Sequence, residues 1–281
     1  MKMREPYVAG SFYESDEEAL RDEIEACFLD KRYGPGSLPS KVHKDKRKII
    51  GLISPHAGYM YSGKIAANGY FQLSYEKKPD LVIVIGPNHE GIGDDVASYP
   101  DGYWKTPLGN VKVDTSALDK VNDGTISIDE LSHQNEHSIE VQLPFLQYIY
   151  GNDFDFLPIC LKDQSLRTAE SIGKILYKIL SQRDAIVVAS TDFTHYETNE
   201  EAHRKDNLAI KAIVEGDPVN FYKTIAENDI SMCGYGAVAT LLYLSKALNG
   251  KTELIKYATS GDIVGDTSFV VGYGSLKVSR V

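Results

Sequence analysis

Three short apolar runs set the strongest limit on what this chain can fold into. They cover residues 48–54, 80–86 and 184–190, and each is about as long as one strand. Nearly continuous apolar residues, without polar alternation, are typical of strands buried on both faces. Helical spacing of apolar residues predicts a helix over 62–73 after the first run and another over 166–180 before the third. This order predicts an α/β domain with a largely parallel or mixed central sheet flanked by helices on both faces.

The rest of the chain adds elements to this sheet. We expect one domain over residues 1–281, with residues 1–47 as an N-terminal arm packed on it and a helix at 15–29 that begins with a capping pattern. Further helices are predicted at 138–150, 200–214, 219–227 and 236–248, and further strands at 154–159, 253–259 and 268–278. The last two strands are expected to add mixed or antiparallel pairing.

Composition excludes several classes of protein. Hydrophobic residues make up 42% and charged residues 25% of the chain, as in ordinary globular proteins. No run approaches the roughly 18 apolar residues of a membrane span, and no signal peptide is recognisable, so we expect a cytoplasmic protein without membrane contact. A net charge of −10 argues against a nucleic-acid partner, and the basic cluster at 41–48 is expected to be a solvated loop. Three cysteines cannot all pair, so they are interpreted as thiols.

A histidine follows each of the three apolar runs. His56, His89 and His195 stand where ligands bind in open α/β sheets, beyond the carboxyl ends of the strands. A lone loop histidine is usually structural, and the Pro and Gly residues beside His56 and His89 would serve any tight loop. The recurrence after three separate runs favours one shared pocket.

Imidazole is the commonest protein ligand for zinc, copper and iron, and Cys233 is a fourth candidate of compatible softness. It stands before the predicted helix 236–248, where the helix dipole is expected to lower the pKa of the thiol. Cys27 and Cys160 are interpreted as small buried hydrophobes. The spacing matches no local metal motif such as Cys-x-x-Cys, so a neutral, hydrogen-bonded histidine core remains an alternative.

Two acidic residues lie near these histidines. Glu136 and His137 stand in the segment 135–144, where Glu136 either belongs to a site or favours a helix N-terminus that Ser138 caps. Asp192 either orients an imidazole or caps the turn that follows it. The other histidines are interpreted as surface residues: His43, His133 and His203.

Two familiar motifs are rejected. Residues 234–239 match the Gly-x-Gly-x-x-Ala form of a dinucleotide-binding loop, but residues 228–233 make a poor strand to precede it. Ser, Asp and His occur together in 190–195, yet the chain has no Gly-x-Ser-x-Gly elbow for a serine hydrolase.

Five segments, in this order, resemble the MEMO family. They are PYVAGSFY at 6–13, SPHAGY at 54–59, GPNH at 86–89, EHSIEVQLP at 136–144 and STDFTHY at 190–196. The resemblance covers nearly the whole chain. It implies the fold of class III extradiol dioxygenases, which are non-haem iron enzymes. The family is named for a eukaryotic mediator of receptor-tyrosine-kinase-driven cell motility.

The resemblance also implies a site. His56 and His89 would be metal ligands, and Cys233 would stand where the dioxygenases carry a carboxylate as third ligand. His195 would match the catalytic base, supported by Asp192, and His137 would be a second pocket histidine. Thiolate shifts metal preference toward copper or zinc without excluding iron, so one iron or copper ion per chain is the expected cofactor.

Two functions of different class are therefore expected. The first is a metal-dependent, dioxygenase-like oxidoreductase that acts on a small molecule. The alternative is a non-enzymatic adaptor that holds a peptide or protein in the same pocket. The sequence leaves the oligomeric state open.

Overall fold

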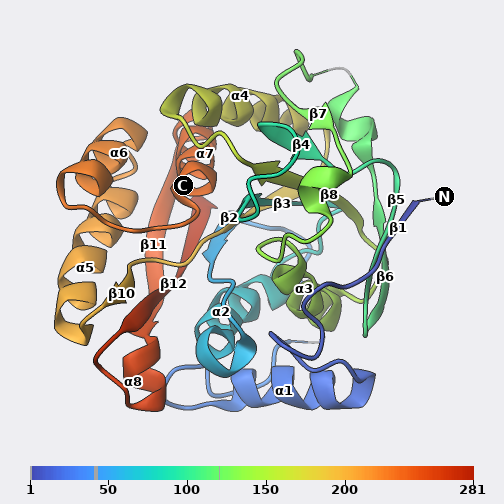
Figure 1. The fold of residues 1–281 in the computed structure, drawn as a ribbon. Helices are drawn as coiled ribbons and strands as arrows, with labels where there is room; N and C mark the ends of the chain where they lie inside the picture. The colour runs from blue at the N-terminus through green and yellow to red at the C-terminus, as the bar shows by residue number, and fades with distance from the viewer. Residues whose placement is uncertain (1, 41–43, 120) are drawn as a thin grey trace.

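In the computed structural model, which describes residues 2–40, 44–119 and 121–281, twelve strands form one mixed sheet with helices on both faces (Figure 1). The strands are β1 (Lys2–Arg4), β2 (Ile49–Ser54), β3 (Leu81–Pro87), β4 (Val96–Ser98), β5 (Gly102–Thr106), β6 (Gly109–Val113), β7 (Ser127–Ile128), β8 (Asp155–Leu161), β9 (Ala185–Ser190), β10 (His195–Glu197), β11 (Gly250–Thr259) and β12 (Val270–Arg280). The α-helices are α1 (Glu17–Leu29), α2 (Tyr59–Ser74), α3 (Leu143–Tyr150), α4 (Leu166–Gln182), α5 (Asn199–Glu215), α6 (Pro218–Glu227), α7 (Tyr235–Ala247) and α8 (Ser260–Val264).

The sheet runs in the order β1-β5-β6-β8-β3-β9-β2-β12-β10, with β11 on β12, β4 on β8 and β7 on β4. The three apolar runs form β2, β3 and β9, which lie side by side, and β9 pairs in parallel with both neighbours. β12 is antiparallel to β2 and to β11. The predicted α/β class with a mixed sheet is confirmed.

Alternate residues of the central strands enter two different cores. Leu81, Ile83 and Ile85 of β3 pack with residues of α4 and α7 on one face. Val82 and Val84 pack on the other face with residues of α1, α2 and α3. Because side chains of a strand point alternately to opposite faces, a strand covered on both sides needs apolar residues at every position.

Several elements differ from those predicted. Helix α3 begins only at Leu143, because Glu140–Gln142 form a short 3₁₀ helix, η3, instead of the first turn of the predicted helix. Strands β4 to β7 were not predicted, since each has only two to five residues. In the N-terminal arm, Asp16 is the N-cap of α1 and accepts from the backbone N–H of Glu18 and Ala19.

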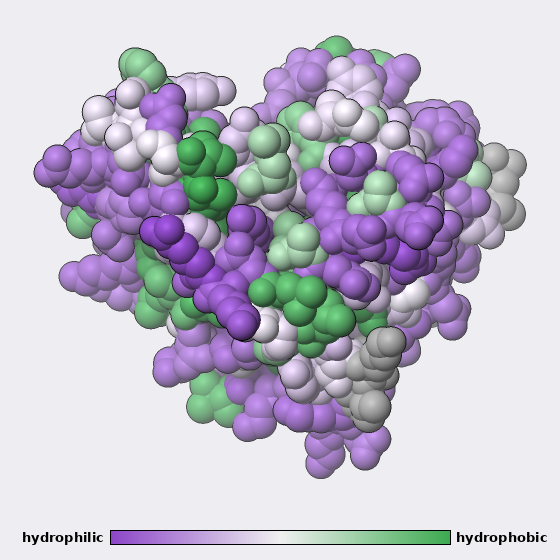
Figure 2. Space-filling view, turned by 90° about the horizontal axis from the view of Figure 1, so that it is seen from below, coloured by the Kyte–Doolittle hydropathy of each residue, from purple (hydrophilic) through white to green (hydrophobic). Residues whose placement is uncertain are grey.

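The surface seen in Figure 2 is mostly hydrophilic, with apolar side chains in separate groups. None of the helices in the described ranges is long and apolar enough to cross a membrane. In the basic cluster, residues 41–43 lie outside the described ranges, and the Arg47 guanidinium is mostly buried against Asp184 instead of solvated.

Candidate metal centre

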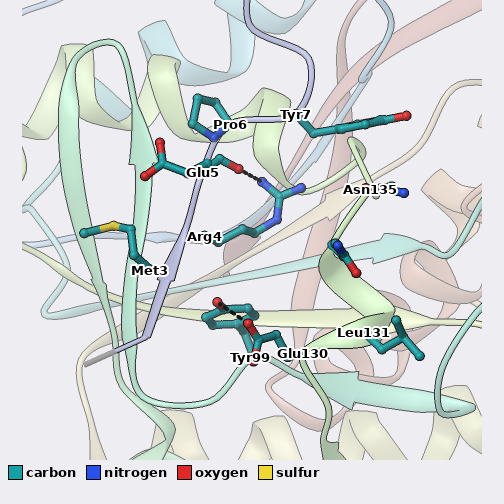
Figure 3. A pocket seen from close by; sticks show the side chains of 10 residues that line it. Met3, Arg4, Glu5, Pro6, Tyr7, Tyr99, Glu130, Leu131 and Asn135 are labelled. Carbon is teal, nitrogen blue, oxygen red and sulfur yellow. Dashed lines mark hydrogen bonds between the residues drawn. The ribbon is translucent and has the colours of Figure 1, made fainter.

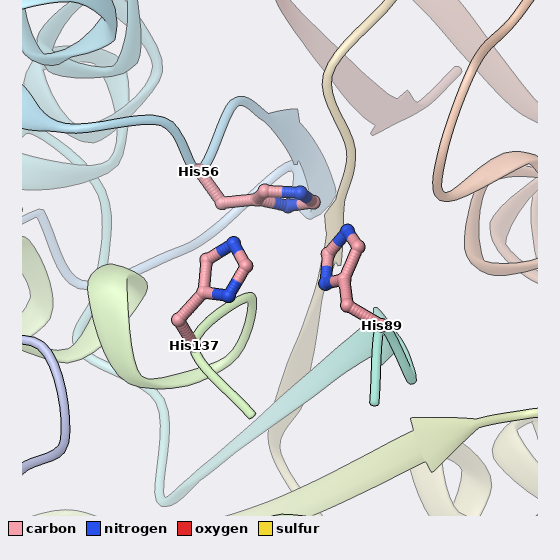
Figure 4. Close-up of side chains that lie close together, drawn as sticks. All are labelled: His56, His89 and His137. Atoms are coloured by element: carbon pink, nitrogen blue, oxygen red, sulfur yellow. The ribbon is translucent and has the colours of Figure 1, made fainter. Parts of the chain in front are cut away.

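The parallel strands bring distant residues to one edge of the sheet. His56, His89 and Asp192 each stand two residues beyond the ends of β2, β3 and β9. Because these strands run in the same direction, the three loops meet. His137 reaches the same place from the irregular segment before η3, and Figure 4 shows its ring beside those of His56 and His89.

The three imidazoles form a compact cluster. The ring centroid of His56 lies 5.2 Å from that of His89 and 5.5 Å from that of His137. The plane of the His56 ring is nearly perpendicular to the planes of the other two rings. The rings of His89 and His137 stack at 4.6 Å with an angle of 16° between their planes. One ring nitrogen from each histidine lies within 4.8 Å of the other two, so these side chains could hold a metal ion.

The hydrogen bonds around Ser190 fix the tautomer of His56. The Ser190 hydroxyl must donate to the carbonyl oxygen of Ser138 at 2.6 Å, and it accepts from Nε2 of Gln142 at 2.8 Å. The hydroxyl has only one proton, so it also accepts from Nδ1–H of His56, at 2.9 Å. Burial, and then the neighbouring histidines, hold the pKa of His56 well below its usual value. His56 is therefore neutral, with the lone pair of Nε2 facing the cluster.

Glu136 orients His89. The carboxylate is 1% exposed and accepts from Nδ1 of His89 at 2.9 Å and from its backbone N–H at 2.5 Å. Burial opposes ionisation of Glu136, but the hydrogen bond and charge of His89, the charge of His137 and the backbone N–H of Ser138 together outweigh it and lower the pKa of the carboxyl to about 2. Burial likewise opposes charge on His89, yet Glu136 raises the pKa of that imidazole. Carboxylate, imidazole and a free Nε2 form the arrangement that supports histidine ligands in metal sites.

Glu136 also accepts from the backbone N–H of Ser138 at 2.7 Å, so it supports the local turn as well as the site. The site alternative is therefore present, but the helix-capping alternative is wrong: the first helical turn, η3, has Ile139 as its N-cap, and Oγ of Ser138 donates to the carbonyl oxygen of Pro87. His137 packs against the ring of Phe12 at 4.8 Å, and burial lowers its pKa to about 4.

Cys233 adjoins the cluster from the N-terminus of α7. Its Sγ lies 3.2 Å from Nε2 of His56 and 3.2 Å from the backbone nitrogen of Asp192. Gly234 permits this approach, because a Cβ there would lie 2.3 Å from the carbonyl oxygen of Ser190. The predicted low pKa is wrong for the metal-free protein: burial, and then the charge of Asp192, raise the pKa of the Cys233 thiol. Loss of hydration outweighs the helix dipole.

Asp192 and His195 have different partners from those expected. The Asp192 carboxylate accepts from the backbone N–H of His56 at 2.8 Å, so it fixes the loop that carries His56. Burial raises the pKa of this carboxyl to about 6. Nδ1 of His195 bonds to the carbonyl oxygen of Ser231 at 2.9 Å, and its backbone N–H donates to Oγ of the same serine. Ser231, and not the Asp192 carboxylate, orients the His195 ring.

The remaining histidines and cysteines lie away from this cluster. His133 is 0% exposed, so its prediction as a surface residue is wrong; it packs against Trp104, and burial lowers its pKa to about 3. His203 is partly exposed and bonds to Asp262. His43 lies outside the described ranges. Cys27 and Cys160 are buried, as predicted.

Four residues that support the site were not singled out from the sequence. Ser190 and Gln142 set the tautomer of His56, and Arg4 and Glu140 form a buried ion pair beside Glu136. Glu140, Gln142 and Ser190 lie in segments that carry the family resemblance, and that resemblance was the available signal for them. Arg4 lies outside these segments, and no pattern in the sequence marks it.

An α/β sheet that gathers three imidazoles beyond its parallel strands, with the Cys233 thiol beside them, defines a protein with a candidate metal centre. The chain belongs to the family described as Memo-like protein, which matches residues 4–277. Curated relatives named "MEMO1 family protein" include those of Thermotoga neapolitana, 46% identical over 99% of this chain and 100% of the relative, and Sulfolobus acidocaldarius, 47% identical over 98% and 99%. The predicted MEMO resemblance is confirmed.

A solved structure shares the fold. The uncharacterized protein JW3007 of Escherichia coli K12 aligns with a TM-score of 0.53 over 82% of this chain and 99% of that chain, at 12% identity. At that identity the likeness concerns the fold alone. The implied kinship with class III extradiol dioxygenases stays a prediction.

Proposed function

We propose that this protein is a metal-dependent redox enzyme of the dioxygenase-like type, which binds one iron or copper ion through His56, His89 and Cys233. The observation that carries the proposal is the pair of unprotonated Nε2 atoms on His56 and His89, each fixed by a hydrogen bond at the opposite ring nitrogen. Imidazoles held in this way are poised as ligands before an ion arrives.

The ring geometry favours Cys233 over His137 as the third ligand. A ligand nitrogen binds through a lone pair in its ring plane, and the stacked planes of His89 and His137 differ by only 16°. Their lone pairs therefore lie in nearly parallel planes, which is a poorer arrangement for two ligands of one ion than ring planes that cross. Sγ of Cys233, in contrast, lies 3.2 Å from Nε2 of His56, close to the spacing of roughly 3 to 3.5 Å between neighbouring ligands of one ion.

The chain supplies a proton acceptor beside this centre. Nδ1 of His195 is held by a carbonyl oxygen, which can only accept, so Nδ1 carries the proton and Nε2 is free to take one from a small substrate. Bound iron or copper would supply Lewis acidity and redox chemistry. His137 adds a second, neutral imidazole beside this centre, which can hydrogen-bond a polar substrate.

Metal analysis of protein purified without oxygen tests the proposal. Wild-type protein supplied with Fe(II) or Cu(I) should retain about one ion per chain, and the His56→Ala and Cys233→Ser variants should lose it. His137→Ala should keep the ion, and Cys27→Ser is the control for removal of a buried thiol elsewhere. Retention by Cys233→Ser with loss by His137→Ala would transfer the third ligand to His137. No bound ion in the wild type would overturn the proposal.

The second candidate is the peptide-binding adaptor. Tyr196, directly after His195, is 73% exposed and offers an aromatic surface at the site. This function becomes the better account if the wild type binds neither metal and a peptide library yields a ligand whose binding is lost in Tyr196→Ala.

A further inference from the structure

Arg4 connects the N-terminal arm to the candidate metal centre. It belongs to β1, stacks over the ring of Trp104 at 4.2 Å and is 4% exposed. Its guanidinium donates to the carbonyl oxygens of His133 and Glu136 at 2.7 and 2.6 Å and to the Glu140 carboxylate at 2.6 Å. A single side chain thus fixes three points of the segment 133–140.

The segment 133–140 contains Glu136, which orients the His89 ring. The backbone that Arg4 holds at Glu136 is the backbone from which the Glu136 carboxylate reaches His89. His137 is the next residue along the chain. Any shift of the Glu136 carbonyl therefore moves both the carboxylate that orients one imidazole and the Cα atom of another.

Hydrogen bonds on one side and the Trp104 ring on the other hold Arg4 in this position. A pocket of about 570 Å³ adjoins it, with Met3, Tyr7 and Leu131 among the residues of the wall (Figure 3). On the other side Glu140 is anchored independently, because it also accepts from the backbone N–H groups of Tyr7 and Val8 and from the hydroxyl of Tyr13. The acceptors of Arg4 thus belong to a rigid frame.

We infer that Arg4 is a positioning residue of the metal centre. By holding the Glu136 carbonyl, it fixes the position of the Glu136 carboxylate and therefore the orientation of the His89 ring. The inference rests on the proposed function for its metal readout. Lys cannot replace Arg here, because one ammonium cannot serve three separated acceptors in the plane of a guanidinium.

Arg4→Lys is the main test, with two readouts. In metal-free protein, the Nδ1–H proton of His89, bonded to a carboxylate, gives a downfield NMR signal that should shift or broaden in the variant. The affinity for Fe(II) or Cu(I), measured by anaerobic competition titration, should fall about tenfold. Tyr13→Phe is the matched control, because it removes a hydrogen bond from Glu140 without touching Glu136; it should leave both readouts unchanged.

A further variant separates positioning from loss of folding. Arg4→Met/Glu140→Gln removes both buried charges, which limits the destabilisation that an unpaired carboxylate causes, and still leaves the Glu136 carbonyl unheld. It should show the same change in the His89 signal. An unchanged signal in a folded Arg4→Lys or double variant overturns the inference. If the wild type binds no metal, the proposed function fails while the NMR comparison still decides the role of Arg4.

Discussion

Sγ of Cys233 lies 3.2 Å from Nε2 of His56, and the hydrogen bonds of the site make the thiol the donor in this contact. His56 carries its proton on Nδ1, so Nε2 can only accept. The raised pKa of the thiol and the lowered pKa of the imidazole keep both groups neutral in the metal-free protein. An ion that binds both atoms must displace the thiol proton, so binding releases a proton to solvent.

The hydroxyl of Ser190 should prove necessary for this arrangement. In Ser190→Ala, the carbonyl oxygen of Ser138 and Nδ1–H of His56 lose a buried partner, which should lower the free energy of unfolding by about 1–3 kcal/mol. The tautomer of His56 should also cease to be uniform. Urea denaturation measures the first effect and ¹⁵N NMR of the imidazole the second.

Ser98→Ala is the control for Ser190. Ser98 is also 0% exposed, and its Oγ has no hydrogen-bond partner among the residues that the structure describes. Replacing this unpaired buried hydroxyl by Ala should leave stability unchanged or raise it, because an unsatisfied buried polar group costs free energy. Equal destabilisation by the two substitutions would contradict the role assigned to Ser190.

The Glu136 carboxylate should control metal affinity through its charge. Glu136→Gln keeps the shape of the side chain but replaces the ionised acceptor of His89, so affinity for Fe(II) or Cu(I) should fall about 10- to 100-fold. Equilibrium dialysis without oxygen measures it. Glu130→Gln, at a side chain that is 46% exposed, should bind as the wild type does. Equal affinities for wild type and Glu136→Gln would show that the carboxylate does not support the ligand.

The strand ends explain why part of the site could be predicted from the sequence. His56 and His89 follow apolar runs, and the parallel sheet alone brings the ends of such runs together. The place of Cys233 was supported by the family resemblance, because it stands 177 residues from His56 and no local spacing joins the two. The pKa of its thiol was predicted in the wrong direction, since the sequence showed the helix that follows but not the burial.

The contacts of Arg4 could not be predicted from pattern. Its partner Glu140 lies 136 residues away in a segment without a regular helix or strand, so neither periodicity nor strand order places it. The same irregular segment carries His137, whose stacking on His89 emerges only from the folded structure. His133 was misplaced at the surface for the same reason.

Backbone strain beside His195 gives another prediction. Tyr196 has φ of 60° at an irregularity between β10 and β12, a conformation that costs most side chains roughly 1 kcal/mol or more. The effect of Tyr196→Gly on the free energy of unfolding should therefore be more favourable than that of Asn249→Gly, because Asn249 tolerates its φ of 51°. We expect a difference of about 0.5–1 kcal/mol between the two effects on unfolding in urea. A larger loss of stability in Tyr196→Gly would mean that its exposed ring packs in solution.

The loop after α1 makes stability depend on pH. Asp30 accepts from the backbone N–H groups of Arg32 and Tyr33 and pairs with Lys64 at 3.0 Å. Partial burial opposes ionisation, but these donors outweigh it and lower the pKa of the carboxyl from 3.8 to about 2. A pKa lowered by folding stabilises the protein above the unfolded value, and this stabilisation is lost as the pH falls from about 4 to about 2.

Asp30→Asn should accordingly lower the free energy of unfolding at pH 7 by about 1–2 kcal/mol, and the difference from wild type should shrink toward pH 2. Urea denaturation at a series of pH values measures it. Asp22→Asn, at an exposed position on α1, should match the wild type at every pH. A difference for Asp30→Asn that stays constant down to pH 2 would show that the amide disturbs the loop by its shape, because a purely structural defect does not titrate with the carboxyl.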